Sequence, residues 1–157
     1  MQLTIASIGK VKQKFVMEAE AEYIKRLKLF TKIRVEEYEF PKLASLQEQE
    51  RKKRETEEFL SKRNAGEFLI ALDENGKQFT SEEFAGFLDK KMTGGVSSFC
   101  FAIGGACGWD LEVMKHGAGL VLSLSSLTFS YQMTRMILVE QIYRAFTIVK
   151  GLPYHKT

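Results

Sequence analysis

The chain has 157 residues, with 45% apolar and 27% charged side chains. These values are typical of a globular protein and exclude a disordered or collagen-like chain. We expect residues 1–157 to form one domain, because the length suits one and is short for two. Cys100 and Cys107 are too few for a disulfide framework, which favours a reducing cytoplasmic location. No apolar run reaches the roughly 20 residues that span a bilayer, so we expect no membrane partner.

The charge is mildly basic, with a net value of +3 at pH 7. Such a charge permits a nucleic-acid partner without requiring one. Residues 1–66 hold 15 Lys and Arg against 11 Asp and Glu, so a phosphate-binding face would draw on this half. A solvated helical surface is the alternative interpretation of the same charges.

The first half of the chain alternates between strand and helix patterns. Residues 3–8 predict a buried strand, and residues 14–30 predict an amphipathic helix. Residues 32–40 predict a second strand. The polar stretch 44–64 predicts an exposed or partly mobile helix, because it has little apolar surface to bury.

The same alternation continues in the middle of the chain. Residues 68–72 predict a third buried strand, and residues 73–76, Asp-Glu-Asn-Gly, predict a turn after it. Thr80 has the pattern of a helix N-cap. Residues 98–103 predict a fourth strand, which leads into a glycine-rich loop at 104–108.

The C-terminal part completes the pattern. Residues 109–116 predict a short helix, and residues 119–124 predict a fifth strand. One long helix is expected from residue 130 to about 150, where Gly151 and Pro153 end it.

Short apolar strands that alternate with helices predict an α/β fold with a mostly parallel sheet and helices on both faces. In such sheets ligands bind beyond the carboxyl ends of the strands. The loops after Leu72, Ile103 and Leu124 would meet there if these three strands are parallel neighbours.

The glycine-rich loop is the first candidate binding element. Gly104-Gly105-x-x-Gly108 lets the backbone approach a ligand closely, although a tight turn explains the glycines equally well. The loop is neither a P-loop nor a dinucleotide fingerprint. Cys107 in this loop is a weak candidate nucleophile, and Cys100 belongs to the core. We expect no metal, because the two histidines are far apart and no zinc-ligand spacing occurs.

The long helix carries a few polar residues within a wide apolar surface. This surface exceeds what one face of a sheet usually needs, which favours a two-fold homodimer. A central helix buried within one subunit is the alternative. The tail after this helix offers an aromatic ring, an imidazole and a cation in Tyr154-His155-Lys156, a combination suited to RNA. A disordered tail is the alternative there.

Four segments in this order resemble the RlmH family of SPOUT-class methyltransferases of the large ribosomal subunit. They are Gly104-Gly105-x-x-Gly108, Leu124-Ser-x-x-Thr128-Phe129, Val139-Glu140-Gln141-x-Tyr143-Arg144-Ala145 and Pro153-Tyr154-His155. The resemblance covers the whole chain, including Ile8-Gly9-Lys10. It implies a SPOUT fold with a deep C-terminal trefoil knot over about residues 68–157. It also implies a homodimer that uses S-adenosylmethionine to methylate N3 of a pseudouridine in 23S rRNA of assembled ribosomes.

The resemblance also implies the roles of individual residues. The cofactor pocket would comprise Leu72, Gly104, Gly105, Leu124, Ser125, Ser126, Leu127, Thr128 and Phe129. Among the catalytic candidates, Arg144 would stabilise the anion that forms on the base. His155 would handle a proton or contact the base, and Tyr154 would stack on a nucleobase.

Two positions depart from the family pattern. Tyr131 stands where the family usually has histidine, and a tyrosine cannot act as a base near neutral pH. Ala106-Cys107 stands where many members have Pro-Glu. Two alternative functions therefore remain. The chain could be a non-catalytic ribosome-binding protein, or a SPOUT enzyme that acts on another RNA such as tRNA.

Overall fold

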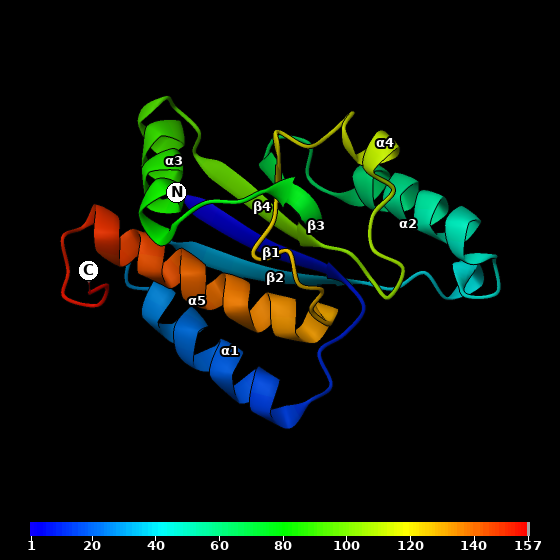
Figure 1. Ribbon diagram of the computed structural model, residues 1–157, viewed down its shortest axis with the longest axis horizontal. Coiled ribbons are helices and arrows are strands. Elements are labelled where there is room, and N and C mark those ends of the chain that lie inside the picture. The colour runs from blue at the N-terminus through cyan, green and yellow to red at the C-terminus, as the bar shows by residue number, and fades with distance from the viewer. Residues whose placement is uncertain (157) are drawn as a thin grey trace.

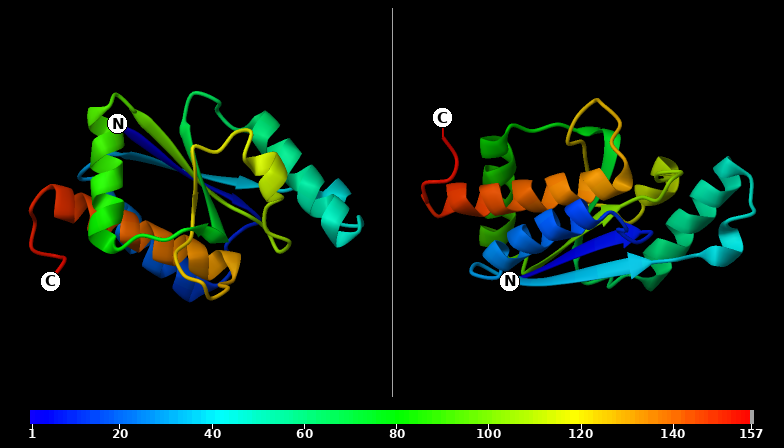
Figure 2. Two further views of the ribbon diagram at one scale, coloured as in Figure 1. Left: turned by 45° about the horizontal axis from the view of Figure 1, so that its top comes forward. Right: turned by 90° about the horizontal axis from the view of Figure 1, so that it is seen from below.

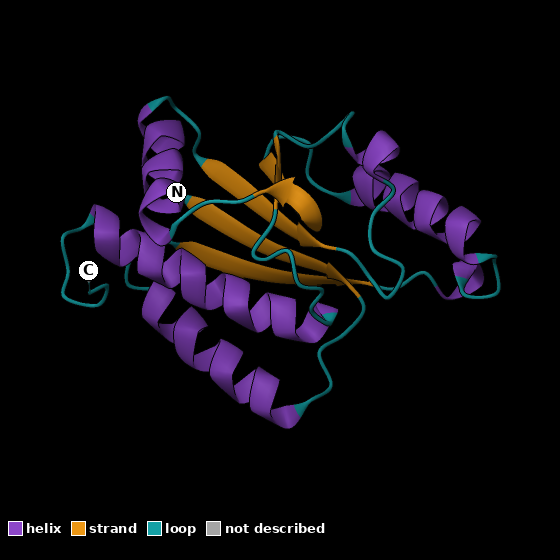
Figure 3. Cartoon of the chain, viewed as in Figure 1, coloured by secondary structure: helices purple, strands orange, loops and turns teal. Residues whose placement is uncertain are grey.

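Five strands form one sheet at the centre of the molecule (Figure 1). The structure is a computed structural model, and it describes residues 1–156. Helices and strands alternate along the chain, as Figure 3 shows. In chain order the elements are β1 Gln2–Ile8, α1 Lys14–Leu27, β2 Lys32–Tyr38, a 3-10 turn Pro41–Leu43, α2 Glu48–Lys62, β3 Phe68–Lys77, α3 Ser81–Thr93, β4 Ser98–Ile103, α4 Leu111–Met114, β5 Leu120–Leu122 and α5 Tyr131–Val149.

The strands lie in the order β2-β1-β4-β3-β5, and all four neighbouring pairs are parallel. The prediction of a mostly parallel sheet is therefore confirmed. β4 lies in the middle, with β1 on one side and β3 on the other. Its residues Phe99–Ile103 are all buried, which explains the uninterrupted apolar pattern of this strand. The three strand ends singled out above belong to the neighbours β4, β3 and β5.

Helices cover both faces of the sheet, as the alternating pattern predicted (Figure 2). α1, α3 and α5 pack on one face over a core that includes Ile5, Phe101 and Leu138. α2 and α4 pack on the other face over a smaller core centred on Phe59 and Trp109, whose ring centroids lie 4.9 Å apart. The two layers are unequal, and the larger one contains the long helix.

α5 lies in the middle of its layer and packs against both α1 and α3. Its buried side chains include Leu138, Val139, Ile142 and Phe146. The apolar surface of this helix is therefore buried within one subunit. This is the alternative given above, a central helix that is buried without a second copy. The width of its apolar surface does not by itself require a second copy.

β3 is longer than the sequence pattern predicted. The turn expected at residues 73–76 is a bulge inside this strand, because Leu72 and Lys77 both align with Leu122 of β5. Gly76 allows the chain to pair with β5 again after the bulge, since a β-carbon at this position would lie 2.7 Å from the Leu122 carbonyl carbon. The prediction that this strand ends at residue 72 was wrong, because the alternation of apolar residues does not show that a strand continues beyond a polar bulge.

Other boundaries differ by a few residues, and most of the polar stretch 44–64 forms helix α2. The first helix ends at Leu27, the second strand at Tyr38 and the fifth at Leu122. α2 forms because Phe59 is fully buried and fixes one face of an otherwise charged helix.

Cys100 lies in the core as predicted, and burial raises the pKa of its thiol to about 12. This thiol is therefore protonated and structural.

Candidate functional site

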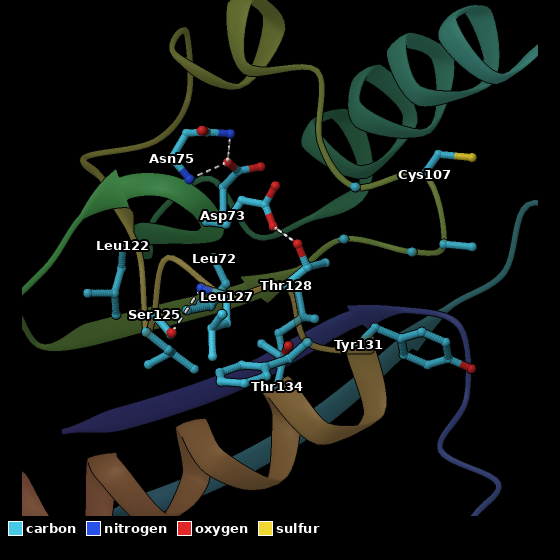
Figure 4. A pocket seen from close by; sticks show the side chains of 18 of the residues that line it. Leu72, Asp73, Asn75, Cys107, Leu122, Ser125, Leu127, Thr128, Tyr131 and Thr134 are labelled. Atoms are coloured by element: carbon cyan, nitrogen blue, oxygen red, sulfur yellow. Dashed lines mark hydrogen bonds between the residues drawn. The ribbon is translucent and has the colours of Figure 1, made fainter.

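A cavity of about 280 Å³ opens at the carboxyl ends of β4, β3 and β5 (Figure 4). Three loops surround it: the bulge of β3, the glycine-rich loop after β4, and the connection between β5 and α5. The first turn of α5 closes one side through Tyr131 and Thr134. This is the edge of a parallel sheet at which ligands are expected to bind.

Most of the residues that the sequence assigned to a cofactor pocket lie around this cavity. Eight of the nine contribute to its lining: Leu72, Gly104, Gly105, Leu124, Ser125, Leu127, Thr128 and Phe129. Ser126 is not part of the lining. Segments that are up to 57 residues apart in sequence thus surround one space, because three parallel strands end side by side.

The glycines of the loop are needed for its own packing. A β-carbon on Gly104 would lie 2.9 Å from the carbonyl carbon of Gly108, and one on Gly105 would lie 3.0 Å from Cγ2 of Ile8. Gly108 has a positive φ of 71°, which a side chain would strain. The tight-turn interpretation is therefore correct for this loop, which also forms one wall of the cavity.

Two carboxylates at the cavity were missed by sequence reasoning. Asp73 and Glu74 contribute to the lining from the bulge of β3, where the sequence predicted only a turn. Glu74 accepts a hydrogen bond from the hydroxyl of Thr128, which connects two loops across the cavity (Figure 4). Asp73 accepts hydrogen bonds from Asn75. Their position directly after a buried strand was the available signal, since that is the carboxyl end of the sheet.

The start of α5 is fixed against the loop between β1 and α1. Tyr131 donates a hydrogen bond to the carbonyl of Lys10 at 2.9 Å, and its ring lies 3.3 Å from where a β-carbon of Gly9 would be. Gln132 accepts from the backbone N–H groups of Lys12 and Gln13. Figure 4 shows the Tyr131 hydroxyl directed away from Thr128 and Leu127. Tyr131 therefore has a clear structural role at the start of α5.

A buried charge cluster lies one turn further along α5. Arg135 donates to Glu20 and Glu37, each at 2.7 Å, and to the hydroxyl of Ser7 at 3.2 Å. The Arg135 side chain is 6% exposed. Its partners come from α1, β2 and β1, so this cluster joins the helical layer to the sheet behind the cavity.

The catalytic candidates form a second group at the other end of α5. Arg144 donates to Glu140 at 2.6 Å, and Tyr154 donates to the same carboxylate oxygen at 2.9 Å. The guanidinium of Arg144 lies 4.8 Å from the ring centroid of Tyr154, and it also contacts His155. The tail is therefore packed against α5, and its Tyr154 and His155 lie beside Arg144.

Side-chain chemistry within this second group is set by these contacts. The hydrogen bond with Glu140 raises the pKa of Arg144, which is fully charged at neutral pH. Burial, followed by hydrogen bonds with Tyr23 and Glu140, raises the pKa of Tyr154 above its ordinary value. The Tyr154 hydroxyl is therefore protonated at neutral pH and donates a hydrogen bond to Glu140.

The two groups of residues are well separated within one chain. Arg144 lies 13 residues after Tyr131 on the same helix, which corresponds to about 20 Å along the helix axis. Figure 1 shows the C-terminus at the end of α5 that is remote from the cavity. A single chain therefore does not place its own Arg144, Tyr154 or His155 at its own cavity.

Comparison with known proteins decides the family. A family model described as "Predicted SPOUT methyltransferase" matches residues 1–155. The chain belongs to the SPOUT methyltransferase family. The cavity and the glycine-rich loop are thus features of a methyltransferase, and the resemblance inferred from the four sequence segments is confirmed.

Curated relatives of this SPOUT methyltransferase share its full length. A "Ribosomal RNA large subunit methyltransferase H" from Bacillus pumilus is 45% identical and covers 99% of this chain and 100% of that protein. Proteins of the same name from Acetivibrio thermocellus and Streptococcus mutans are each 41% identical over the same shares of both chains.

Two further findings concern metal sites and helices that could span a membrane. Among residues 1–156, no three His, Cys, Asp or Glu side chains form a group that could hold a metal ion. No helix in the described part of the chain is long and apolar enough to cross a membrane.

Proposed function

We propose that this SPOUT methyltransferase transfers a methyl group from S-adenosylmethionine to N3 of a pseudouridine in 23S rRNA, within the assembled ribosome. The observation that carries the proposal is the cavity at the ends of β4, β3 and β5, lined by eight of the nine residues assigned from the sequence. The names of the full-length relatives support ribosomal RNA of the large subunit as the substrate.

The lining of the cavity fits the proposed cofactor. Leu72, Ile103 and Leu124 provide an apolar surface suited to an adenine ring. Asp73 and Glu74 favour a ligand that carries positive charge, as the sulfonium and ammonium groups do. S-adenosylmethionine supplies an electrophilic methyl group on a positively charged sulfur. The Glu74–Thr128 hydrogen bond holds two walls of the cavity together around such a ligand.

The residues of the tail would act on the target base. N3 of pseudouridine is an imide nitrogen, which becomes a good nucleophile when it loses its proton to water. The methyl group would then move from the sulfonium sulfur to N3, and the sulfur would be left as a neutral thioether. The permanently charged Arg144 would stabilise the resulting anion, and its ion pair with Glu140 fixes the guanidinium in place. Tyr154 would present its ring to a nucleobase.

A homodimer follows as part of the proposal, because each active site needs both groups of residues. The tail cluster of one subunit would complete the cavity of the other. Exposed apolar side chains lie at the cavity end of the subunit and suit burial against a second copy: Leu127 is 70% exposed, Phe15 59% and Met17 51%. The proposed interface therefore includes the start of α1, the loop before α5 and the tail cluster.

A deep trefoil knot over about residues 68–157 also belongs to the proposal. It is supported by family membership and by the placement of β5 beside β3, from which the chain continues into α5. The cytoplasm is the proposed location, since the proposed substrate is the ribosome.

The test is transfer of tritium from labelled S-adenosylmethionine to purified ribosomes, with separated subunits and free tRNA as controls. We expect label on 23S rRNA, and only in assembled ribosomes. Label on tRNA would assign a different RNA substrate. Ribosome binding without any label would show a non-catalytic protein and contradict the proposal.

A further inference from the structure

The imidazole of His155 is held between two helices. Its Nδ1 lies 3.2 Å from Nη1 of Arg144 on α5, and its Nε2 lies 2.7 Å from Oε1 of Glu82 in the first turn of α3. The His155 side chain is only 18% exposed, whereas that of Glu82 is 52% exposed. Both ring nitrogens therefore have a partner within hydrogen-bond distance.

These partners decide where the ring carries its proton. A guanidinium can only donate hydrogen bonds, so Nδ1 of His155 must accept from Arg144. A ring nitrogen that accepts carries no proton, which leaves the proton on Nε2. That N–H points at the carboxylate of Glu82, whose pKa is lowered by this hydrogen bond.

The remaining groups near the imidazole offer Nδ1 no free hydrogen-bond acceptor. An N–H at Nδ1 would point at the guanidinium of Arg144, which has only donors. Glu140 is engaged by Arg144 and by the hydroxyl of Tyr154. Glu82 is the one carboxylate in direct contact with the ring among the described residues, and the neutral Nε2–H form already supplies the proton for that hydrogen bond.

We propose that Glu82 is a positioning residue, which with Arg144 holds His155 as the neutral Nε2–H tautomer and fixes the tail on its own subunit. His155 then takes no proton from the target base, because its single lone pair is occupied by Arg144. It orients Arg144 instead: Nη1 is held by His155 and Nη2 by Glu140, which leaves the other N–H groups free to face the base. The catalytic use of this arrangement depends on the function proposed above.

Nuclear magnetic resonance tests the tautomer directly, because the chain has only two histidines. Long-range ¹H–¹⁵N spectra of the full chain at about pH 7.5 distinguish the two neutral tautomers from imidazolium. We expect His155 as the Nε2–H form, and His116 serves as the reference within the same spectrum. Glu82→Ala should let the ring turn away from Arg144, so that both tautomers become populated. Glu82→Gln should retain the assignment, because its amide oxygen still accepts. Asp89→Ala, on the same helix, is the matched control.

Methyl transfer tests the consequence for the reaction. We expect Glu82→Ala to lower kcat on ribosomes by about tenfold through misplacement of Arg144, with the KM for the cofactor unchanged. Glu82→Gln should recover most of kcat, and Asp89→Ala should leave kcat as it is. A merely structural role of Glu82 would instead lower the melting temperature of Glu82→Ala and leave its kcat unchanged.

Three results would overturn the proposal: an Nδ1–H tautomer, a protonated His155 at pH 7.5, or an unchanged spectrum in Glu82→Ala. If the wild-type chain transfers no methyl group, the proposed function fails, and the spectra still decide the role of Glu82 in holding His155.

Discussion

At the scale of single residues, Gly104 shows how little space this site allows. The β-carbon of an alanine there would lie 2.9 Å from the backbone of Gly108, so the loop would have to move. We expect Gly104→Ala to cost about 1–3 kcal/mol of stability. We also expect it to weaken cofactor binding by about tenfold or more, measured by calorimetry.

Gly86 provides the control for this substitution. It lies in α3, and a β-carbon added to it would have no other atom within 4 Å. Gly86→Ala should therefore stabilise the protein by about 0.5–1 kcal/mol and leave cofactor binding unchanged. Equal affinity for the cofactor in Gly104→Ala and wild type would contradict the placement of the site.

Tyr131 is the second residue whose role can be decided by itself. Its hydroxyl donates to the Lys10 carbonyl, so Tyr131→Phe should lower the free energy of unfolding by about 0.5–1.5 kcal/mol. Because this hydroxyl points away from the cavity, we expect methyl transfer to stay within about twofold of the wild type. A loss of a hundredfold would instead make the hydroxyl part of the chemistry. A large gain of transfer in Tyr131→His would show that the native residue impairs activity.

At the scale of elements, Arg135 joins α5 to α1 and the sheet. Arg135→Met would leave the carboxylates of Glu20 and Glu37 without their cation, in a largely buried place. We expect a loss of about 3–5 kcal/mol in the free energy of unfolding, measured with urea. Arg54→Met is the control, because Arg54 is exposed and lies 3.9 Å from Glu57; the loss there should be below about 1 kcal/mol. Similar losses in both variants would contradict the importance of the buried cluster.

The elements also show where sequence reasoning succeeds. Strand β4 is buried on both faces and bounded by turn residues, so its apolar run predicted it to the residue. The predicted end of β3 was wrong, because the bulge at Asp73–Gly76 is polar. The strand continues beyond the bulge only through the pairing of Lys77 with β5. The cavity residues could be predicted, because they follow strands directly, whereas Asp73 and Glu74 fit the pattern of a turn.

At the scale of the whole molecule, the proposed homodimer can be tested by mixing two inactive proteins. Arg144→Ala lacks the tail cation, and Gly104→Val should lack a usable cavity. In a mixed dimer, the intact cavity of the first would meet the intact tail of the second. With random exchange of subunits, roughly a quarter of the wild-type activity should return, since half of the dimers would each hold one complete site.

Each variant alone should remain inactive in the same assay. No recovery after exchange of subunits, confirmed by mass spectrometry of the mixed dimers, would show that each chain uses its own residues. A monomer in sedimentation experiments would contradict the composite site outright, because about 20 Å along α5 separates the two groups within one chain.

The amino-acid sequence alone was enough to predict the alternation of elements, the parallel sheet covered on both faces, the family, and the set of loops that surround the cavity. This was possible because the periodicity of apolar residues is a local property of the sequence, and because parallel strands all end at the same edge of a sheet. The three-dimensional structure was needed to show which strands are neighbours, that α5 is covered on both sides by α1 and α3, and that Arg144 lies far from its own cavity. These properties depend on contacts between residues that are distant in sequence, so they cannot be predicted from a local pattern.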